Sequence, residues 1–167
     1  MTNGKGQMTS TLLKTAIFLI IAPGTVIVYV PYLLLGRRFQ IPTEANLLGL
    51  VLVLPGAAIL LICAWDFGVT GRGTPAPIDP PKILVARGLY RYVRNPMYVG
   101  VALVLLGESI LFASARVLGY ALCVCLAFHL FVLFYEEPGL RRKFGDSYVD
   151  YCHRVNRWLP RAKSLHT

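Results

Sequence analysis

The sequence contains few charged residues. Only 15% of its 167 residues are Asp, Glu, Lys or Arg, whereas 56% are hydrophobic, and the mean hydropathy is +0.59. Soluble domains have about 25% charged residues, so this composition excludes an ordinary soluble domain and predicts a membrane protein. Because each helical span needs roughly 20 residues, four or five spans leave no room for a separate soluble catalytic domain.

Acidic residues are especially scarce. Eight Asp and Glu residues oppose 17 Lys and Arg residues, which gives a net charge of +9. In a membrane protein this excess predicts basic loops that face an anionic leaflet. No soluble element carries a basic stripe with interleaved aromatic residues, so we expect no nucleic-acid partner.

The four cysteines lack the spacing of a metal site or a disulfide framework. Cys63, Cys123 and Cys125 lie in apolar segments, and we expect them to be small buried hydrophobic residues. The polar first ten residues precede a long apolar run without a small-residue cleavage pattern, which predicts a retained first span. We expect no metal cofactor.

What the sequence does contain is four long apolar runs. They cover residues 15–35, 47–65, 97–115 and 117–135, and they predict an all-α integral membrane protein with four spans, or five if the first region is split. The connection between the last two spans is very short and is formed by Ser114, Ala115 and Arg116 where the two runs meet, which predicts an antiparallel hairpin. The whole chain, 1–167, is therefore expected to form one membrane domain.

The basic residues predict the orientation of these spans. Fourteen of the 17 Lys and Arg residues lie before the first span, in the 66–96 loop or in the 136–167 tail. By the positive-inside rule, both termini and this loop are predicted to be cytoplasmic, most simply in an inner membrane.

The tail has a helical pattern of apolar residues. It predicts one cytoplasmic amphipathic helix that begins at Pro138 and ends near Trp158. This helix either lies on the lipid headgroups or closes over a site at the inner ends of spans three and four. The apolar stripe consists of Leu140, Phe144, Tyr148, Tyr151 and Val155.

Two dense polar clusters lie where spans three and four meet the cytoplasmic surface. The segment GLYRYVRNPMYVG (88–100) places Arg91, Arg94 and Asn95 before Pro96, which is a typical first residue of a helix. Free backbone N–H groups beside arginines form an anion site, although these residues are also ordinary interfacial anchors.

The second cluster is Glu136-Glu137, at the predicted end of span four. Carboxylates at the carboxyl end of a helix oppose the helix dipole, so their position needs a reason. Either they pair with Arg141 and Arg142, or they face a cationic ligand.

Two further ionisable residues, Glu108 and His129, lie within predicted spans and differ in depth by roughly 9 Å. Glu108 is either functional, or it snorkels or makes a hydrogen bond inside the bundle; His129 is either functional or a polar helix-packing contact. Direct pairing between them is not expected. Gly100, Gly107 and Gly119 predict close helix packing in the same spans.

Together the clusters resemble a known pattern. The strings KILVARGLYRYVRNPMYVG and EEPGLRRKFGDSYVDYCHRVNRWLP are similar to those of the isoprenylcysteine carboxyl methyltransferase and phospholipid methyltransferase superfamily of membrane enzymes, over about residues 74 to 160. The resemblance implies an S-adenosylmethionine-dependent methyltransferase whose cofactor site is formed by helix ends, the 66–96 loop and the 136–167 tail. The absence of a G-x-G-x-x-G motif between a strand and a helix agrees with a site that has no Rossmann domain.

Carried over by position, the resemblance implies a set of site residues. The resemblance places Arg94 in the cofactor bed at the start of span three. As a separate hypothesis on the mechanism, Arg91 and Arg94 are expected to act in catalysis by orienting an anionic acceptor. The acceptor would be lipophilic or delivered by the membrane: an isoprenylcysteine-type carboxylate, a phospholipid amine or a small thiol. The implied cofactor-binding residues are Lys82, Leu84, Val85, Tyr90, Asn95, Pro96, Tyr98, Glu136, Glu137, Tyr148 and Tyr151.

The chain departs from the family pattern at three positions. Asn95 replaces the usual His, Asn156 replaces a frequent Pro, and Val132 stands where the eukaryotic prenylcysteine enzymes have an Arg for the substrate carboxylate. The last difference argues against prenylcysteine methylation. The alternatives are a four-span transporter that uses Glu108, and a non-catalytic lipid-binding relative.

Overall fold

The computed structural model describes residues 21–36, 43–70, 84 and 86–161. This part of the chain is all-helical, and its only extended pairing is an isolated parallel bridge between Val93 and Asn156. The α-helices are α2 (Val30–Leu35), α3 (Leu50–Thr70), α4 (Pro96–Leu111), α5 (Ala115–Phe131), α6 (Glu137–Phe144) and α7 (Asp146–Arg154).

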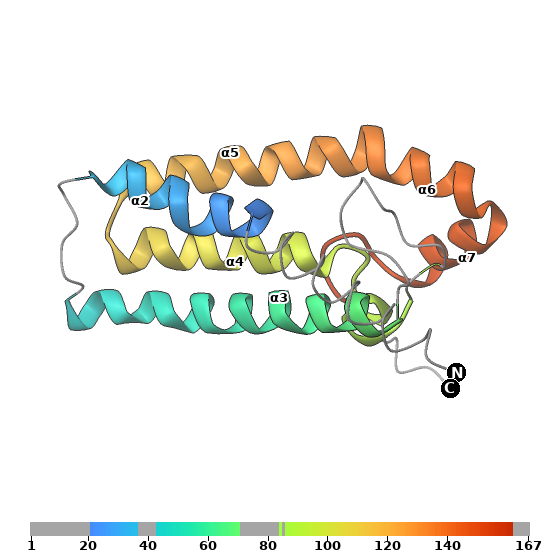
Figure 1. Ribbon diagram of the computed structural model, residues 1–167, viewed down its shortest axis with the longest axis horizontal. Helices are drawn as coiled ribbons and strands as arrows, with labels where there is room; N and C mark the ends of the chain where they lie inside the picture. Colours follow the sequence, from blue (N-terminus) through green and yellow to red (C-terminus); the bar gives the residue numbers. More distant parts are fainter. Residues whose placement is uncertain (1–20, 37–42, 71–83, 85, 162–167) are drawn as a thin grey trace, which may run out of the picture.

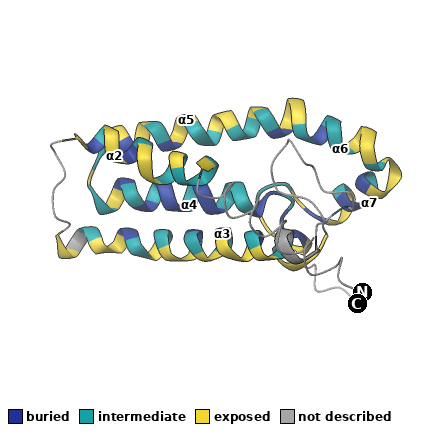
Figure 2. Cartoon of the chain, in the orientation of Figure 1, coloured by how far each residue is buried: buried dark blue, intermediate teal, exposed yellow. Residues whose placement is uncertain are grey.

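Three long helices, α3, α4 and α5, lie side by side, and α4 is in the middle (Figure 1). The core is formed where Val104 and Leu105 of α4 pack against Leu60 of α3 and Ala121 of α5. In contrast, leucines on the outer faces are exposed, including Leu61 at 69% and Leu122 at 59% (Figure 2). An apolar exterior around an apolar core is what a lipid environment allows.

Glycines permit the closest approach, which is between α3 and α4. A Cβ atom on Gly107 would lie 2.7 Å from the Gly49 carbonyl oxygen, and one on Gly100 would lie 3.0 Å from that of Gly56. The prediction of close packing is therefore confirmed for Gly100 and Gly107. It is wrong for Gly119, because a Cβ there would meet nothing within 4 Å.

Two helical stretches, Asn46–Asp66 and Ala115–Phe144, are long and apolar enough to cross a membrane. Two shorter apolar helices cover Ile21–Leu35 and Pro96–Leu111. Each coincides with one of the predicted apolar runs, although residues 15–20 of the first run lie outside the described residues.

The connections differ from the prediction in two places. Helix α3 continues to Thr70, so the loop predicted from residue 66 begins later. The α4–α5 turn occupies Phe112 to Ser114, because the Ser114 hydroxyl accepts a hydrogen bond from the Val117 N–H at 3.4 Å and caps α5 one residue before Ala115.

The tail is also not the single helix that was predicted. Helix α6 begins at Glu137 as a direct continuation of α5 through the π-helical turn Val132–Glu136. Gly145, with φ +54°, then ends α6, and α7 runs in a new direction (Figure 1). Residues 155–161 are not helical, so the helix ends at Arg154, earlier than the predicted end near Trp158.

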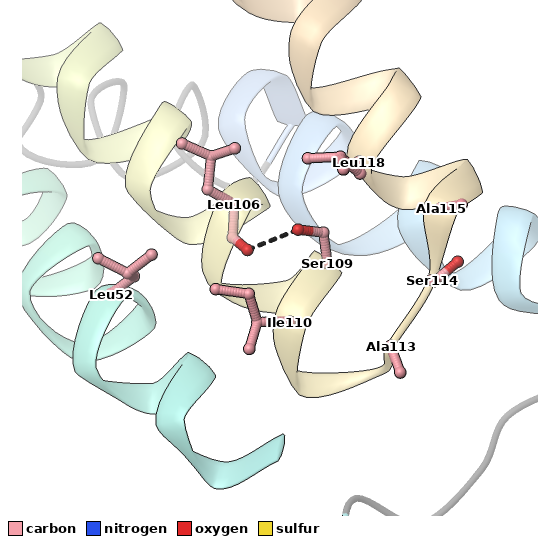
Figure 3. Close-up of a pocket in the computed structure, with 8 residues that line it drawn as sticks. All are labelled: Leu52, Leu106, Ser109, Ile110, Ala113, Ser114, Ala115 and Leu118. Carbon is pink, nitrogen blue, oxygen red and sulfur yellow. Dashed lines mark hydrogen bonds between the residues drawn. The ribbon is translucent and has the colours of Figure 1, made fainter. Parts of the chain in front are cut away.

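The end of the bundle with the α4–α5 turn, which we call the hairpin end, contains an open apolar pocket of about 480 Å³ (Figure 3). Both hydroxyl groups of its lining are engaged, because Ser109 donates a hydrogen bond to the Leu106 carbonyl oxygen at 2.7 Å and Ser114 accepts one from the Val117 N–H at 3.4 Å. This pocket offers space without reactive groups.

Candidate active site

The two polar clusters of the sequence meet at the opposite end of the bundle, which we call the site end. Here α3 ends, α4 begins at Pro96, and the α6–α7 segment turns back toward α4 (Figure 1). The segment 93–95 lies against the tail, because the Arg94 N–H donates to the Asn156 carbonyl oxygen at 2.9 Å. The fold thus brings residues about sixty positions apart into one site.

Glu137 is the most strongly paired charge of this site. Its carboxylate lies 3.0 Å from Arg94 Nη1 and 2.7 Å from Arg157 Nε, and Arg157 Nη2 donates to its second oxygen at 2.9 Å. Glu137 is only 6% exposed. The hydrogen bonds that Arg157 donates to Glu137 raise the pKa of Arg157, which agrees with a charged pair.

The neighbouring Glu136 points to a different partner. One oxygen of its carboxylate accepts a hydrogen bond from the Tyr98 hydroxyl at 2.9 Å. No arginine pairs with Glu136 within the described part of the chain. A carboxylate has about four lone-pair positions, so Glu136 retains acceptor capacity.

These contacts change two expectations about the acidic pair. Arg141 and Arg142 are exposed, and the ion pairs of Glu137 are made to Arg94 and Arg157 instead. Because α6 continues the helix to Phe144, the pair is not at a helix end and the argument from the helix dipole does not apply. Glu136 closes a π-helical turn, a feature that is frequent at functional sites.

The chain after α7 forms a strap across the site, which we define as residues Val155 to Trp158. The Asn95 amide donates to the Arg157 carbonyl oxygen at 3.3 Å, and the Trp158 indole N–H donates to Nδ1 of His129 at 3.3 Å. Together with Arg157–Glu137, these bonds join the start of α4 to α5 and α6. His129 therefore has the polar packing contact that was one of its two predicted roles.

An aromatic cluster lies beneath this strap. The Tyr151 hydroxyl donates to the Tyr90 carbonyl oxygen at 2.6 Å, and Tyr148, Tyr151 and Val155 form a buried cluster against which Leu84 packs. Burial raises the pKa of both tyrosine hydroxyls, so they remain neutral hydrogen-bonding groups near neutral pH.

Most of the sequence-predicted site residues thus lie at one end of the bundle. Pro96 is the first residue of α4, and Asn95 precedes it with 9% exposure. Arg91 is exposed and has no ion pair among the described residues. Lys82 and Val85 lie outside the described residues.

The departures from the family pattern have structural counterparts. Asn95 serves as an amide donor to the strap, a role that needs no titrating imidazole. Asn156, two residues beyond the end of α7, accepts the hydrogen bond from the Arg94 N–H through its backbone carbonyl oxygen. Val132 is fully buried.

Sequence reasoning missed two charged residues of the site end. Arg157 is absent from the predicted site residues, because nothing in a helical pattern predicts that the chain turns back to Glu137. Asp66, in the last turns of α3, has a buried Oδ2 without a hydrogen-bond partner among the described residues. This atom lies against Gly88, whose φ of +54° and missing side chain leave it room. The feature of the sequence that could have identified Asp66 is its position as a carboxylate near the end of an apolar run.

The fold and site together define an integral membrane protein of apolar helices with one polar, charged site at a single end. The phospholipid methyltransferase family matches residues 45–147, well over half of the chain, and the chain belongs to that family. It is therefore an S-adenosylmethionine-dependent methyltransferase, with a lipid as the implied methyl acceptor. No protein in a search of curated sequences matches the chain.

The matched region covers α3 to the start of α7 and ends before Tyr148. Tyr151 and the whole strap lie beyond it. Family membership thus covers the acidic pair and the start of α4, whereas the roles of the tail residues depend on the contacts described above.

Proposed function

We propose that this protein transfers a methyl group from S-adenosylmethionine to the amine headgroup of a phospholipid at the site end of the bundle. The observation that carries this proposal is the division of the acidic pair. Two arginines neutralise Glu137, while Glu136 keeps a carboxylate that is bonded only to Tyr98 among the described residues. Glu136 is thus the carboxylate available to a cationic ligand.

The residues present fit the cofactor. Glu136 would accept hydrogen bonds from its ammonium group or ribose hydroxyls. Tyr90, Tyr148 and Tyr151 would enclose it together with Leu84, and Arg94 has a buried Nε–H donor without a partner among the described residues. We assign Glu137 a positioning role, because its lone pairs are engaged by Arg94 and Arg157.

When bound, the cofactor would supply a methyl group on a sulfonium. The acceptor amine would take up this methyl group in its neutral form, which would leave a neutral thioether and release one proton to solvent. The chain itself supplies alignment and exclusion of water, through the strap and the buried tyrosines. No step requires a covalent intermediate on the protein.

Two observations favour a phospholipid amine over the other acceptors. The family that matches the chain is named for phospholipids. The prenylcysteine enzymes bind the substrate carboxylate with an Arg, and the residue at that position in this chain, Val132, is fully buried and apolar. An amine acceptor does not need an Arg at this position.

The test combines cofactor binding with the fate of the methyl group. Calorimetry of the purified protein should detect binding of the demethylated cofactor, S-adenosylhomocysteine, and Glu136→Gln should weaken it by tenfold or more. Glu44→Gln removes an exposed carboxylate in the Glu44–Gly49 turn at the hairpin end and should leave affinity unchanged.

In membranes incubated with a radiolabelled methyl donor, label should enter phosphatidylethanolamine. Label in protein or small thiols alone would overturn the choice of acceptor. Equal affinities of Glu136→Gln and wild type would overturn the role of Glu136.

A further inference from the structure

The ion pairs around Glu137 leave one positive charge unmatched. Arg94 and Arg157 are two guanidinium groups that share a single carboxylate, and Glu137 is 6% exposed. Charges that are removed from water are normally paired within the protein or with a ligand. The cluster Arg94–Glu137–Arg157 therefore carries one net positive charge, because Glu136, the next carboxylate, is bonded to Tyr98 and pairs with neither arginine.

The unmatched charge lies on Arg94. Arg157 uses both Nε and Nη2 on Glu137, at 2.7 and 2.9 Å. Arg94 uses only Nη1, which contacts Glu137 at 3.0 Å and the Cys152 sulfur at 2.8 Å. Its Nε is buried without a hydrogen-bond partner among the described residues, although the side chain as a whole is 12% exposed.

The free part of Arg94 has a defined shape. Nε–H and one N–H of Nη2 point in parallel from one edge of the planar guanidinium group, and this edge matches two oxygens of a carboxylate or a phosphate. A buried donor without a partner also costs free energy, so a ligand that supplies these oxygens would be favoured.

We propose that the Nε–Nη2 edge of Arg94 is an oxyanion site for one of the two reactants. The oxyanion is either the phosphate of the phospholipid acceptor or the α-carboxylate of the cofactor. This inference rests on the proposed function and adds to it a second binding group of opposite charge. Glu136 and Arg94 reach the site from adjoining elements, since Glu136 directly precedes Glu137, the partner of Arg94. Such an arrangement fits a zwitterion, which both reactants contain.

The test needs a variant that keeps the charge of Arg94 but removes the edge. Arg94→Lys does so, because an ammonium group still faces Glu137 but has no parallel pair of donors. The matched control is Arg157→Lys, which disturbs the same carboxylate from the other side and leaves the Arg94 edge in place. Thermal melting of both variants in detergent shows that each is folded.

Binding is measured by calorimetry in detergent with two pairs of probes. One pair is lysophosphatidylethanolamine and a long-chain alkylamine without phosphate. The other is S-adenosylhomocysteine and its decarboxylated analogue. The cofactor pair differs only in the carboxylate, and the lipid pair shares the amine and the long hydrocarbon chain, whereas only the lysophospholipid has the glycerophosphate.

If Arg94 binds phosphate, Arg94→Lys loses tenfold or more in affinity for the lysophospholipid and less than threefold for the alkylamine. If it binds the cofactor carboxylate, the same contrast appears between S-adenosylhomocysteine and its decarboxylated analogue. Arg157→Lys should change both members of each pair equally. Both contrasts are measured as binding and do not depend on turnover.

The proposal is overturned if Arg94→Lys affects both members of each pair by the same factor, as the control does. Arg94 would then only hold Glu137 in place. Failure of the proposed function looks different, because wild type itself would bind neither S-adenosylhomocysteine nor lysophosphatidylethanolamine.

Discussion

The two ends of the helix bundle differ in how they are stabilised. At the hairpin end, mostly apolar side chains surround an open pocket, and its two hydroxyl groups, of Ser109 and Ser114, have hydrogen-bond partners close by in the chain (Figure 3). At the site end, charged groups from α4, α6 and the strap pair with one another. Packing therefore determines stability at one end and buried electrostatics at the other.

Because of this difference, effects on helix packing can be separated from effects on ligand binding. A substitution at the hairpin end changes how helices pack without reaching any group of the proposed site. A substitution at the site end changes ligand binding and local structure together, because Glu137 and Arg94 belong to both. Variants at the two ends can therefore test whether helix packing and ligand binding depend on different ends of the bundle.

We expect the largest effect from Glu137→Gln. It removes the counter-charge shared by Arg94 and Arg157 and leaves two guanidinium groups facing a neutral amide. Breaking a buried ion pair from one side costs about 3–5 kcal/mol. Thermal melting in detergent should show a strong loss of stability, and hydrogen exchange should increase in the strap.

The matched comparison is Glu136→Gln, which changes the next residue but no ion pair in the described part of the chain. It should retain stability to within about 1 kcal/mol, since only one hydrogen bond is altered. Equal destabilisation by both variants would contradict the division of the acidic pair.

The sequence predicted the elements of this site better than their connections. The apolar runs and the two motifs placed Arg94, Tyr98 and Glu137 correctly at one end, because span length and motif order are local properties. Arg157 could not be placed in the same way. Its contact with Glu137 depends on two changes of chain direction, at Gly145 and after Arg154.

The tail shows that helical periodicity in a sequence does not reveal where one helix ends and the next begins. Leu140, Phe144, Tyr148 and Tyr151 follow one helical pattern, but they belong to two helices separated by Gly145. Apolar residues recur at helical spacing on both sides of the break because both helices bury one face. Gly145, as the residue that permits a positive φ, was the only local sign of the break.

At the α3–α4 interface, Gly107→Ala should have an intermediate effect on stability. The added Cβ would lie 2.7 Å from the Gly49 carbonyl oxygen and 2.8 Å from the Val53 nitrogen, and backbone atoms cannot move aside easily. Overpacking of this kind costs about 1–3 kcal/mol. The melting temperature should fall, while the folded protein should bind S-adenosylhomocysteine with unchanged affinity.

Gly119→Ala is the control for this substitution, because α5 has open space at that position. Alanine is the better helix former, so this variant should be as stable as wild type or more stable by up to about 1 kcal/mol. Reduced cofactor affinity in folded Gly107→Ala would mean that the α3–α4 packing also shapes the site end.

The smallest effect is expected from Glu108→Gln. Glu108 lies in α4 one turn before the hairpin, and its buried Oε2 has no hydrogen-bond partner among the described residues. A neutral amide of nearly the same size removes an unpaired buried carboxylate oxygen, so stability should be unchanged or slightly higher. Methyl transfer to phosphatidylethanolamine in reconstituted vesicles should continue at the wild-type rate, since Glu108 belongs to the hairpin end. A severalfold loss of transfer would show that a charge at that end influences the reaction, and the separation between the two ends of the bundle would then fail.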